Sequence, residues 1–567
     1  MRDLAVSATD LRKVYRQPTG ESVTALDDID IEVQTGEIFG LIGADGAGKT
    51  TLFQILAGVL EPTSGSVQIL GQSPSTAQGK VGFLTQPFSL HQDLSVDENL
   101  RYLAGLRDVS PQDFRSRSEQ YLSEFGLAQF RSRLAGRLSG GMKQKLALTG
   151  ALISDPEIIL LDEPTVGVDP LSRREFWDVL WSLARGGKTI VVATPYFDEA
   201  ARCSRVALVE AGRVLRVDEP RALAAEYGGG SLEEAFVALL ERERGHEEPP
   251  PFPEPSTTRD EPGKPALSVH QLEKRFGDFR AVKGIDLIFR HGETYGLLGA
   301  NGAGKTTAIK MMCGLLAPTS GTVWLMGHKE GLTSPAVRSQ MGYKSQKFAL
   351  YDDLTVGENL DFYAGLYGVP ERIRSKRKQW ALEAAGLAAR ANALTAMLPD
   401  GWKQRVAFGA AMMHEPRVLL LDEPSSGVDA LARRSMWKLI RDFANQGAAV
   451  LVVTHYLDEA ERCTRLGFMS EGDLRIEGTP ADVKSSAPGG MLEVKADRLE
   501  LAAQMLVSKF GGECVSHFGD RLHVHCTEVL ADSLCADLAA HGCRQTSAAP
   551  VDPTLEDAVL ALLRHRE

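Results

Sequence analysis

The chain contains the same long stretch of sequence twice, and this internal repeat constrains the fold more than any other feature. The stretch from Leu4 to about Leu240 recurs from Leu267 to about Ala481. Residues Gly43–Thr50 reappear as Gly299–Thr306 at an offset of 256, and further along the offset becomes 260. Residues can therefore be compared one for one between the halves. A repeat of this length indicates two domains of one fold.

Each repeat carries the glycine-rich pattern G-x-x-x-x-G-K-T between a strand-like run and a helix-like run. Backbone N–H groups of such a loop wrap phosphates, and the following helix N-terminus favours their negative charge. We expect Lys49 and Lys305 to reach the β- and γ-phosphates of ATP, and Thr50 and Thr306 to bind Mg²⁺. The expected cofactor-binding residues are Gly43, Ala44, Asp45, Gly46, Ala47, Gly48, Lys49, Thr50, Thr51, Gly299, Ala300, Asn301, Gly302, Ala303, Gly304, Lys305, Thr306 and Thr307.

A second motif in each half is an apolar strand pattern that ends in two carboxylates. In open α/β folds, ligands bind at the carboxyl ends of the strands. Asp162 and Asp422 are therefore placed to hold Mg²⁺, directly or through water. Glu163 and Glu423 follow them and can polarise the attacking water. The two motifs together predict hydrolysis of ATP with Mg²⁺ as the metal.

Between these motifs the first half reads Leu138-Ser139-Gly140-Gly141-Met142-Lys143-Gln144, which resembles the signature sequence of ABC ATPases. The resemblance implies an α/β fold with two tandem P-loop ABC ATPase domains, each a RecA-like core with antiparallel β and helical subdomains. It also implies that each ATP lies between the phosphate loop of one half and the signature of the other. The signature residues expected to bind ATP are Ser139, Gly140, Gly141 and Gly401.

The same resemblance assigns the remaining roles. The implied Q-loop and D-loop residues are Gln86, Gln346, Asp169 and Asp429. The implied switch histidine is His455, and Tyr15 and Phe276 match the aromatic residue that the family stacks on adenine. The expected catalytic residues are Glu423, His455, Gln346, Glu163 and Gln86. The expected metal ligands are Thr50, Gln86, Asp162, Thr306, Gln346 and Asp422.

The two halves differ at positions that matter for hydrolysis. Pro195 replaces the switch histidine in the first half, and proline offers neither an imidazole nor an N–H. In the second half the signature reads Pro399-Asp400-Gly401, which lacks the serine hydroxyl and places a carboxylate near phosphate. Head-to-tail pairing puts both defects in one site. We expect the site with Lys305 to hydrolyse ATP and the other to bind it or turn over slowly; sequence drift without consequence is the alternative.

The predicted boundaries are 1–244 for the first nucleotide-binding domain, 245–265 for a linker, 266–488 for the second domain and 489–567 for a small α+β extension. The linker is rich in proline and acidic residues, which favours an extended spacer; about 20 residues at ~3.1 Å each reach about 60 Å. In the extension, alternating strand and helix patterns precede a last segment that resembles the end of the first half. We interpret the extension as an insertion before a terminal helix.

The apolar runs are strand-sized and shorter than the 18 or more residues needed to cross a bilayer, and the N-terminus lacks a signal-peptide pattern. We therefore expect a cytoplasmic protein, peripheral on the cytoplasmic face of the inner membrane. The net charge of −12 and pI of about 5.6 argue against direct nucleic-acid binding.

The second-half Leu-Pro-x-Gly-x-Lys-Gln and the Leu-Glu-(Glu/Asp)-Ala endings resemble tandem ATPases of ABC exporters. This resemblance implies integral membrane permease subunits as partners, with a periplasmic adaptor protein contacted through the permease. The predicted function is therefore the ATP-hydrolysing subunit of an exporter of small molecules or drugs. The alternatives are the tandem ATPase of an importer and an ABC ATPase that acts on the ribosome or nucleic acid.

Overall fold

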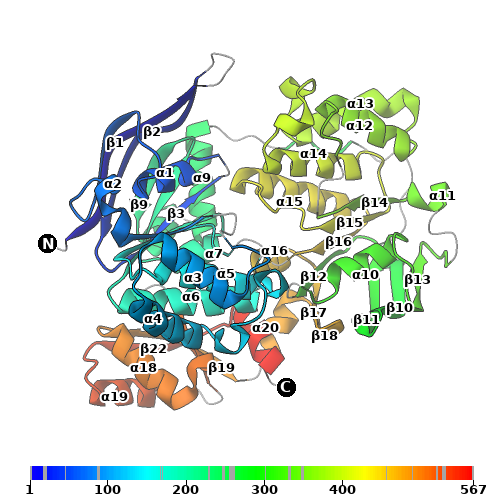
Figure 1. Ribbon diagram of the computed structural model, residues 1–567. Coiled ribbons are helices and arrows are strands. Elements are labelled where there is room, and N and C mark those ends of the chain that lie inside the picture. The colour runs from blue at the N-terminus through cyan, green and yellow to red at the C-terminus, as the bar shows by residue number, and fades with distance from the viewer. Residues whose placement is uncertain are drawn as a thin grey trace. The chain divides into compact units, whose positions relative to one another are not determined.

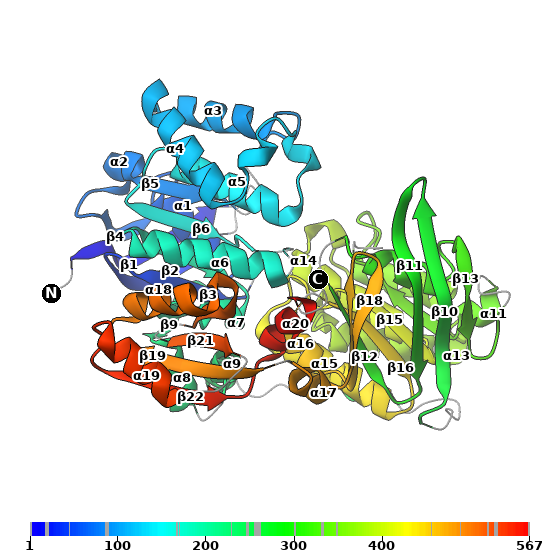
Figure 2. The same ribbon diagram turned by 90° about the horizontal axis from the view of Figure 1, so that it is seen from below.

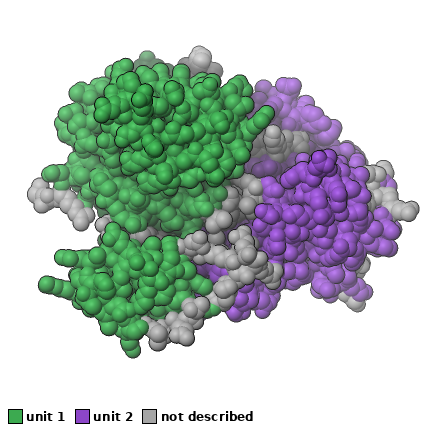
Figure 3. Space-filling model, turned by 60° about the horizontal axis from the view of Figure 1, so that its bottom comes forward, with its two compact units in different colours: residues 1–245, 489–551 green, residues 246–488, 552–567 purple. Residues whose placement is uncertain are grey.

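The computed structural model forms two compact units. One contains residues 1–245 and 489–551, and the other contains residues 246–488 and 552–567 (Figure 3). The structure describes residues 3–16, 22–44, 46–85, 90–165, 168, 170–227, 230–244, 249–253, 262–299, 302–329, 334–346, 350–454, 456–487, 489–518, 521–526 and 531–564.

The first half contains two sheets. An antiparallel sheet in the order β2-β1-β4 is made of β1 (Leu4–Arg16), β2 (Ser22–Gln34) and β4 (Ser64–Ile69). The larger sheet has the order β5-β6-β7-β3-β8-β9 and is parallel except for β9. Its strands are β3 (Ile38–Gly43), β5 (Val81–Leu84), β6 (Ile158–Asp162), β7 (Thr189–Thr194), β8 (Arg205–Glu210) and β9 (Arg213–Asp218). Strands β3, β6 and β7 are buried along their whole length, as expected for a parallel sheet covered on both faces.

The helices of the first half begin at recognisable sequence signals. Ser95 and Glu98 form a capping box at α3, and Ser139 caps α5 by accepting from the N–H of Met142 at 3.3 Å. The helices are α1 (Lys49–Leu56), α2 (Pro74–Ala77), α3 (Val96–Leu106), α4 (Pro111–Glu124), α5 (Gly140–Leu152), α6 (Pro170–Arg185), α7 (Phe197–Ala200), α8 (Pro220–Glu226) and α9 (Leu232–Arg244), with short 3-10 turns at 78–80, 128–130 and 135–137.

The second half repeats this plan. Its antiparallel sheet has the order β11-β10-β13, and its core sheet has the order β14-β15-β16-β12-β17-β18. The strands are β10 (Pro265–Phe276), β11 (Phe279–Arg290), β12 (Thr294–Gly299), β13 (Ser320–Leu325), β14 (Met341–Lys344), β15 (Val418–Asp422), β16 (Ala449–Val453), β17 (Arg465–Ser470) and β18 (Asp473–Gly478). The match of both sheets confirms the predicted duplication of one α/β fold.

A group of packed helices forms the helical part of the second half (Figure 1). Its members are α12 (Val356–Leu366), α13 (Glu371–Ala384) and α14 (Asp400–Met412). The other helices are α10 (Lys305–Met312), α11 (Pro335–Arg338), α15 (Ala430–Asn445), α16 (Leu457–Glu461) and α17 (Pro480–Ser485), with 3-10 turns at 388–390 and 395–397. Thr355 and Glu358 repeat the capping box at α12.

The extension has its own sheet in the order β20-β21-β19-β22, with α18 and α19 beside it (Figure 2). Its elements are β19 (Gly490–Ala496), α18 (Leu499–Phe510), β20 (Val515–Phe518), β21 (Arg521–Cys526), α19 (Ala531–Ala540) and β22 (Thr546–Val551), with a 3-10 turn at 512–514. The last helix, α20 (Leu555–Arg564), shares a core with the second half through Leu298, Phe468 and Val483. In chain order the extension is thus inserted between α17 and α20.

The predicted linker has one buried anchor. Phe252 packs against Trp380 of α13 and Phe443 of α15, with its ring centroid 4.6 and 5.0 Å from theirs. The spacer prediction did not include this contact. The domain boundaries drawn from sequence remain predictions. Within the described residues no helix is long and apolar enough to cross a membrane.

Candidate active sites

The two glycine-rich loops join the central strand of each core sheet to a helix. Lys49, Thr50 and Thr51 open α1, and Lys305, Thr306 and Thr307 open α10 in the same way. Gly48 and Gly304 adopt φ angles of 100° and 98°. A Cβ at these positions would lie 2.5 Å from the Ala25 carbonyl oxygen and 2.2 Å from that of Ala281. Only glycine therefore permits this entry into the helix.

The loops fit a phosphate. Gly46 and Gly302 also have left-handed φ angles, and a Cβ there would meet nothing within 4 Å, which leaves room above the loop. Neither helix start carries a side-chain cap, so its N–H groups suit an anion. The Lys49 ammonium donates to the Gly43 carbonyl at 2.8 Å. Lys305 donates likewise to the Gly299 carbonyl at 2.6 Å.

The acidic strand ends fit a divalent cation. Asp162 and Asp422 end β6 and β15, and both oxygens of each carboxylate are buried without a hydrogen-bond partner among the described residues. Burial raises the pKa of Asp162, while nearby Thr50 and Lys49 act against it. Burial and the Glu423 carboxylate raise the pKa of Asp422 to about 6. Buried, unpaired carboxylate oxygens are the donor set that Mg²⁺ prefers.

The glutamates that follow turn out of the strand direction. Glu163 and Glu423 have φ angles of 49° and 48°. The Glu163 carboxylate lies 3.5 Å from the Lys49 ammonium. The Glu423 carboxylate accepts a hydrogen bond from the Gln346 amide at 3.0 Å. The structure thus brings the expected catalytic Glu423 and Gln346 together.

In each half a buried glutamate accepts hydrogen bonds both from the segment after the acidic pair and from the end of the neighbouring strand. The Glu459 carboxylate accepts from the hydroxyls of Ser425 and Thr454, the second at 2.6 Å, and from the Trp437 indole N–H at 3.3 Å. Glu199 repeats this in the first half with the Thr165 and Thr194 hydroxyls. Each carboxylate therefore joins the chain after the acidic pair to the residue before the switch position.

The signature positions differ in structure as they do in sequence. Ser139 caps α5 with its hydroxyl, whereas Pro399 begins α14 without any side-chain hydrogen bond. Gly140 and Gly141 lie in the first turn of α5, and Asp400 and Gly401 lie in the first turn of α14. Pro195 is half-buried at the end of β7. The starts of α5 and α14 therefore differ in side-chain capping, and the difference in ATP turnover expected between the two sites remains a prediction.

The residues matched to adenine stacking lie at strand ends with their rings accessible. Tyr15 is the last residue but one of β1 and is 39% exposed, and Phe276 ends β10 and is 51% exposed. Asp429 caps α15 by accepting from the N–H of Ala432 at 3.0 Å. The remaining expected site residues lie outside the described part of the chain: Asp45, Gln86, Asp169, Ala300, Asn301 and His455.

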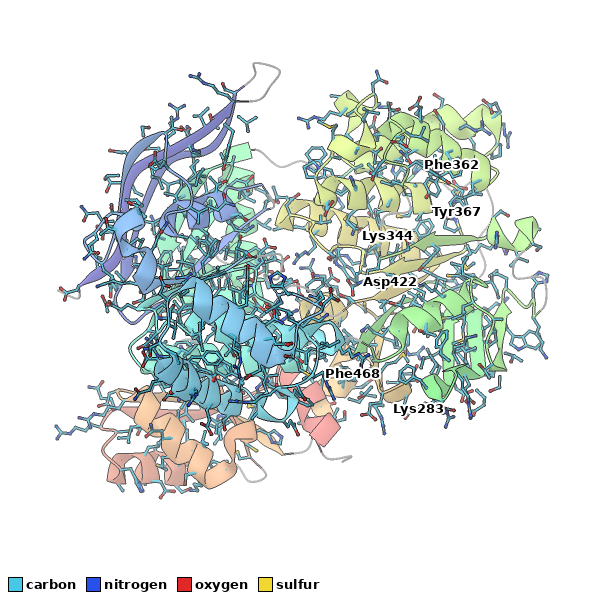
Figure 4. The ribbon with its side chains drawn as sticks, viewed as in Figure 1. Lys283, Lys344, Phe362, Tyr367, Asp422 and Phe468 are labelled. Atoms are coloured by element: carbon cyan, nitrogen blue, oxygen red, sulfur yellow. The ribbon has the colours of Figure 1, made fainter. Side chains whose placement is uncertain are left out.

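Three features of the structure were not predicted from the sequence. They are the buried glutamates Glu199 and Glu459, the contact of Phe252, and Lys344, which lies beside the second acidic pair (Figure 4). Lys344 carried a usable signal, because the equivalent residue in the first half is Leu84 and both end an apolar strand pattern. The two glutamates carried no such sequence signal, because a single charged residue in a helix is common.

A glycine-rich loop, an acidic strand end and a signature helix on one α/β core define the nucleotide-binding cassette of a P-loop ATPase, and this chain has the architecture twice. The model of the ABC transporter family matches residues 26–166 and 282–426. The chain therefore belongs to the ABC transporter family, as an ATP-binding ATPase with tandem cassettes.

Relatives agree with this assignment. The chain is 38% identical over 554 residues to the "Probable multidrug ABC transporter ATP-binding protein YbhF" of Escherichia coli, covering 86% of this chain and 95% of that protein. It is 27% identical over 515 residues to the "Ribose import ATP-binding protein RbsA" of Halalkalibacterium halodurans, covering 85% and 98%. The solved archaeal ribosome recycling factor aABCE1, in complex with the stalk protein aP1, is similar in fold, with a TM-score of 0.60, 21% identity, and coverage of 84% and 91%.

Proposed function

We propose that this protein is the ATP-hydrolysing subunit of an ABC exporter and drives efflux of a small molecule through separate permease subunits on the cytoplasmic face of the membrane. The observation that carries this proposal is the 38% identity to a multidrug-type ATP-binding protein along nearly its full length. The similarity to an importer ATPase is lower, at 27%. The similarity to the ribosome recycling factor, at 21% identity, concerns the fold alone.

The two sites have unequal roles in this proposal. ATP with Mg²⁺ at Lys305, Thr306 and Asp422 meets the intact Ser139 signature, and Glu423 polarises the attacking water. ATP at Lys49 meets the Pro399-Asp400 signature and turns over slowly. Support comes from the Gln346–Glu423 hydrogen bond and from the capping difference between Ser139 and Pro399.

Paired Glu→Gln substitutions test the assignment. Glu423→Gln keeps the size of the side chain and removes the charge, so we expect it to reduce ATP turnover by at least about 100-fold. Glu163→Gln serves as the matched control and should leave most of the turnover. Loss of activity in Glu163→Gln together with retention in Glu423→Gln would reverse the roles of the two sites.

An exposed aromatic group next to the Gln346 segment fits the docking of a permease helix. Tyr351, Phe362 and Leu366 are 50%, 42% and 62% exposed, and the Tyr351 and Phe362 ring centroids lie 4.9 Å apart. The first half presents Tyr102 and Leu106 at the equivalent positions of α3. Exposed apolar side chains of this kind mark interaction surfaces.

Purification from gently solubilised membranes tests the transport role. We expect stoichiometric integral membrane proteins to accompany the tagged chain through a salt wash. Phe362→Ser should weaken their retention and leave basal ATP turnover unchanged. Ribosomal proteins or nucleic acid in place of membrane proteins would overturn the exporter proposal, and a co-purified importer permease would reverse the direction of transport.

A further inference from the structure

A buried lysine lies beneath the second acidic pair and has no role in the scheme above. Lys344 ends β14, and its side chain is 2% exposed. Its ammonium donates to the main-chain carbonyl of Glu423 at 3.2 Å and to that of Asp422 at 3.4 Å. The carboxylates of Asp422, Glu423 and Glu459 are its charged neighbours.

The first half shows what this position needs structurally. Leu84 ends β5 in the same register, opposite Leu161, and is 5% exposed. Lys344 lies opposite Leu421 in β15. An apolar side chain thus completes the same sheet in the other half of the chain. The fold itself does not require an ammonium group here.

Burying a lysine is costly. The desolvation of an ammonium ion amounts to several kcal/mol unless nearby acceptors compensate it, and burial lowers the pKa of Lys344 to about 8. Replacing such a group by an apolar residue of similar size is often neutral or stabilising. A buried lysine that the fold can do without, placed at one of the two acidic pairs, indicates a functional use.

We propose that Lys344 is a positioning residue of the second site: its ammonium holds the main chain of Asp422 and Glu423 so that the Glu423 carboxylate stays aligned for hydrolysis. This inference rests on the proposed hydrolytic role of the second site. The two carbonyl contacts hold Asp422 and the left-handed Glu423, and Gln346, two residues beyond Lys344, holds the Glu423 carboxylate itself.

The test compares Lys344→Met with Leu84→Met, which places the same side chain at the equivalent position of the first half. We expect Lys344→Met to lower kcat by about 10- to 100-fold, the range seen when an outer partner of a site is removed. The KM for ATP should stay within about twofold, and the melting temperature should be unchanged or higher. Leu84→Met should leave kcat unchanged. Lys344→Arg, which keeps the charge, should recover part of the kcat lost in Lys344→Met.

Each other outcome has a distinct meaning. An unchanged kcat in Lys344→Met, with turnover lost in Glu423→Gln, overturns the role of Lys344 and leaves the proposed function intact. A lower kcat accompanied by a lower melting temperature, with Lys344→Arg no better than Lys344→Met, shows a packing role and also overturns the inference. Full turnover in Glu423→Gln overturns the proposed function, and the inference with it.

Discussion

Glu163 and Glu423 share a backbone conformation that residues with a side chain seldom adopt. Their φ angles near +50° cost on the order of 1 kcal/mol each. The turn persists because the N–H of Glu163 donates to the Ala193 carbonyl at 2.9 Å, and that of Glu423 donates to the Val453 carbonyl at 2.8 Å. Sheet pairing therefore holds the strained residue, and the strain directs its carboxylate away from the strand.

Asp422 gives a prediction with a defined pH dependence. Its pKa is raised from 3.8 to about 6, so the ionised form destabilises the fold above pH 6 by on the order of 3 kcal/mol, and the cost disappears as pH falls towards 4. Asp422→Asn should therefore raise the melting temperature of the nucleotide-free, Mg²⁺-free protein at pH 7.5. Its advantage should shrink steadily towards pH 4.5. Thermal unfolding at the two pH values measures this.

The first half supplies the control for this experiment. The pKa of Asp162 is also raised by burial, and Thr50 and Lys49 oppose this shift as Thr306, Lys344 and Lys305 do for Asp422. The difference is that Glu163 is not among the causes that raise the pKa of Asp162, whereas Glu423 raises that of Asp422. Asp162→Asn should therefore stabilise the protein less than Asp422→Asn. A lower melting temperature for Asp422→Asn at pH 7.5 would contradict the electrostatic reading. Loss of Mg²⁺-dependent turnover in the same variant is expected and independent of this result.

At the scale of elements, the sequence predicted what depends on local pattern. The strand before each phosphate loop, the helix after it and the acidic strand end all follow from apolar runs and glycine spacing, and the structure has them at β3, α1 and β6. The burial of Lys344 could not be predicted from the sequence, because its neighbours lie in β15 and in the loop after it, about 80 residues further along the chain. The switch residue His455 and the Q-loop residue Gln86 lie outside the described residues, so their roles remain predictions.

In the linker, too, a contact between residues distant in the sequence could not be predicted. Its proline density indicated an extended segment. Of its described residues, 249–253 and 262–264 belong to no helix or strand, and Pro265 begins β10. The burial of Phe252 depends on Trp380 and Phe443, and on the Arg377 guanidinium 5.4 Å from its ring centre. A single aromatic residue among prolines does not reveal partners more than 100 residues away.

Phe252 therefore yields a prediction about stability. Replacing a buried phenylalanine by alanine removes apolar contacts and leaves a cavity, at a cost of about 3–5 kcal/mol. Phe252→Ala should lower the melting temperature of the second half and expose the linker to protease. Pro251→Ala, at an exposed neighbouring position, is the control and should change neither property. Equal melting temperatures for the two variants would show that the anchor contributes little.

At the scale of the whole molecule, the sequence predicted the duplication of the fold. It did not predict that the extension belongs to the same compact unit as the first half. Residues 489–551 belong to the same compact unit as the first half. The Arg174 guanidinium donates to the Ser516 hydroxyl, and Arg221 pairs with Glu493 at 3.4 Å. These residues are some 270 to 340 positions apart, and each would be an ordinary surface residue in its own segment. Only the folded chain shows that they meet.

The position of α20 in the core of the second half predicts which deletions the chain tolerates. Val483 of α17 and Leu555 and Val559 of α20 share one core with Leu298 and Phe468, so the two ends of the extension lie close together. Replacing residues 489–551 by a short Gly/Ser linker should keep α20 in place and leave the second half protected from hydrogen exchange. Ending the chain at residue 488 removes α20 as well and uncovers that core, at a cost of about 2 kcal/mol for each large apolar side chain lost. Hydrogen exchange measured on peptides from β17 should therefore rise in the truncated chain and stay near its full-length rate in the excised one. Equal protection in both would mean that α20 is dispensable, and equal loss in both would mean that the extension itself supports the second half.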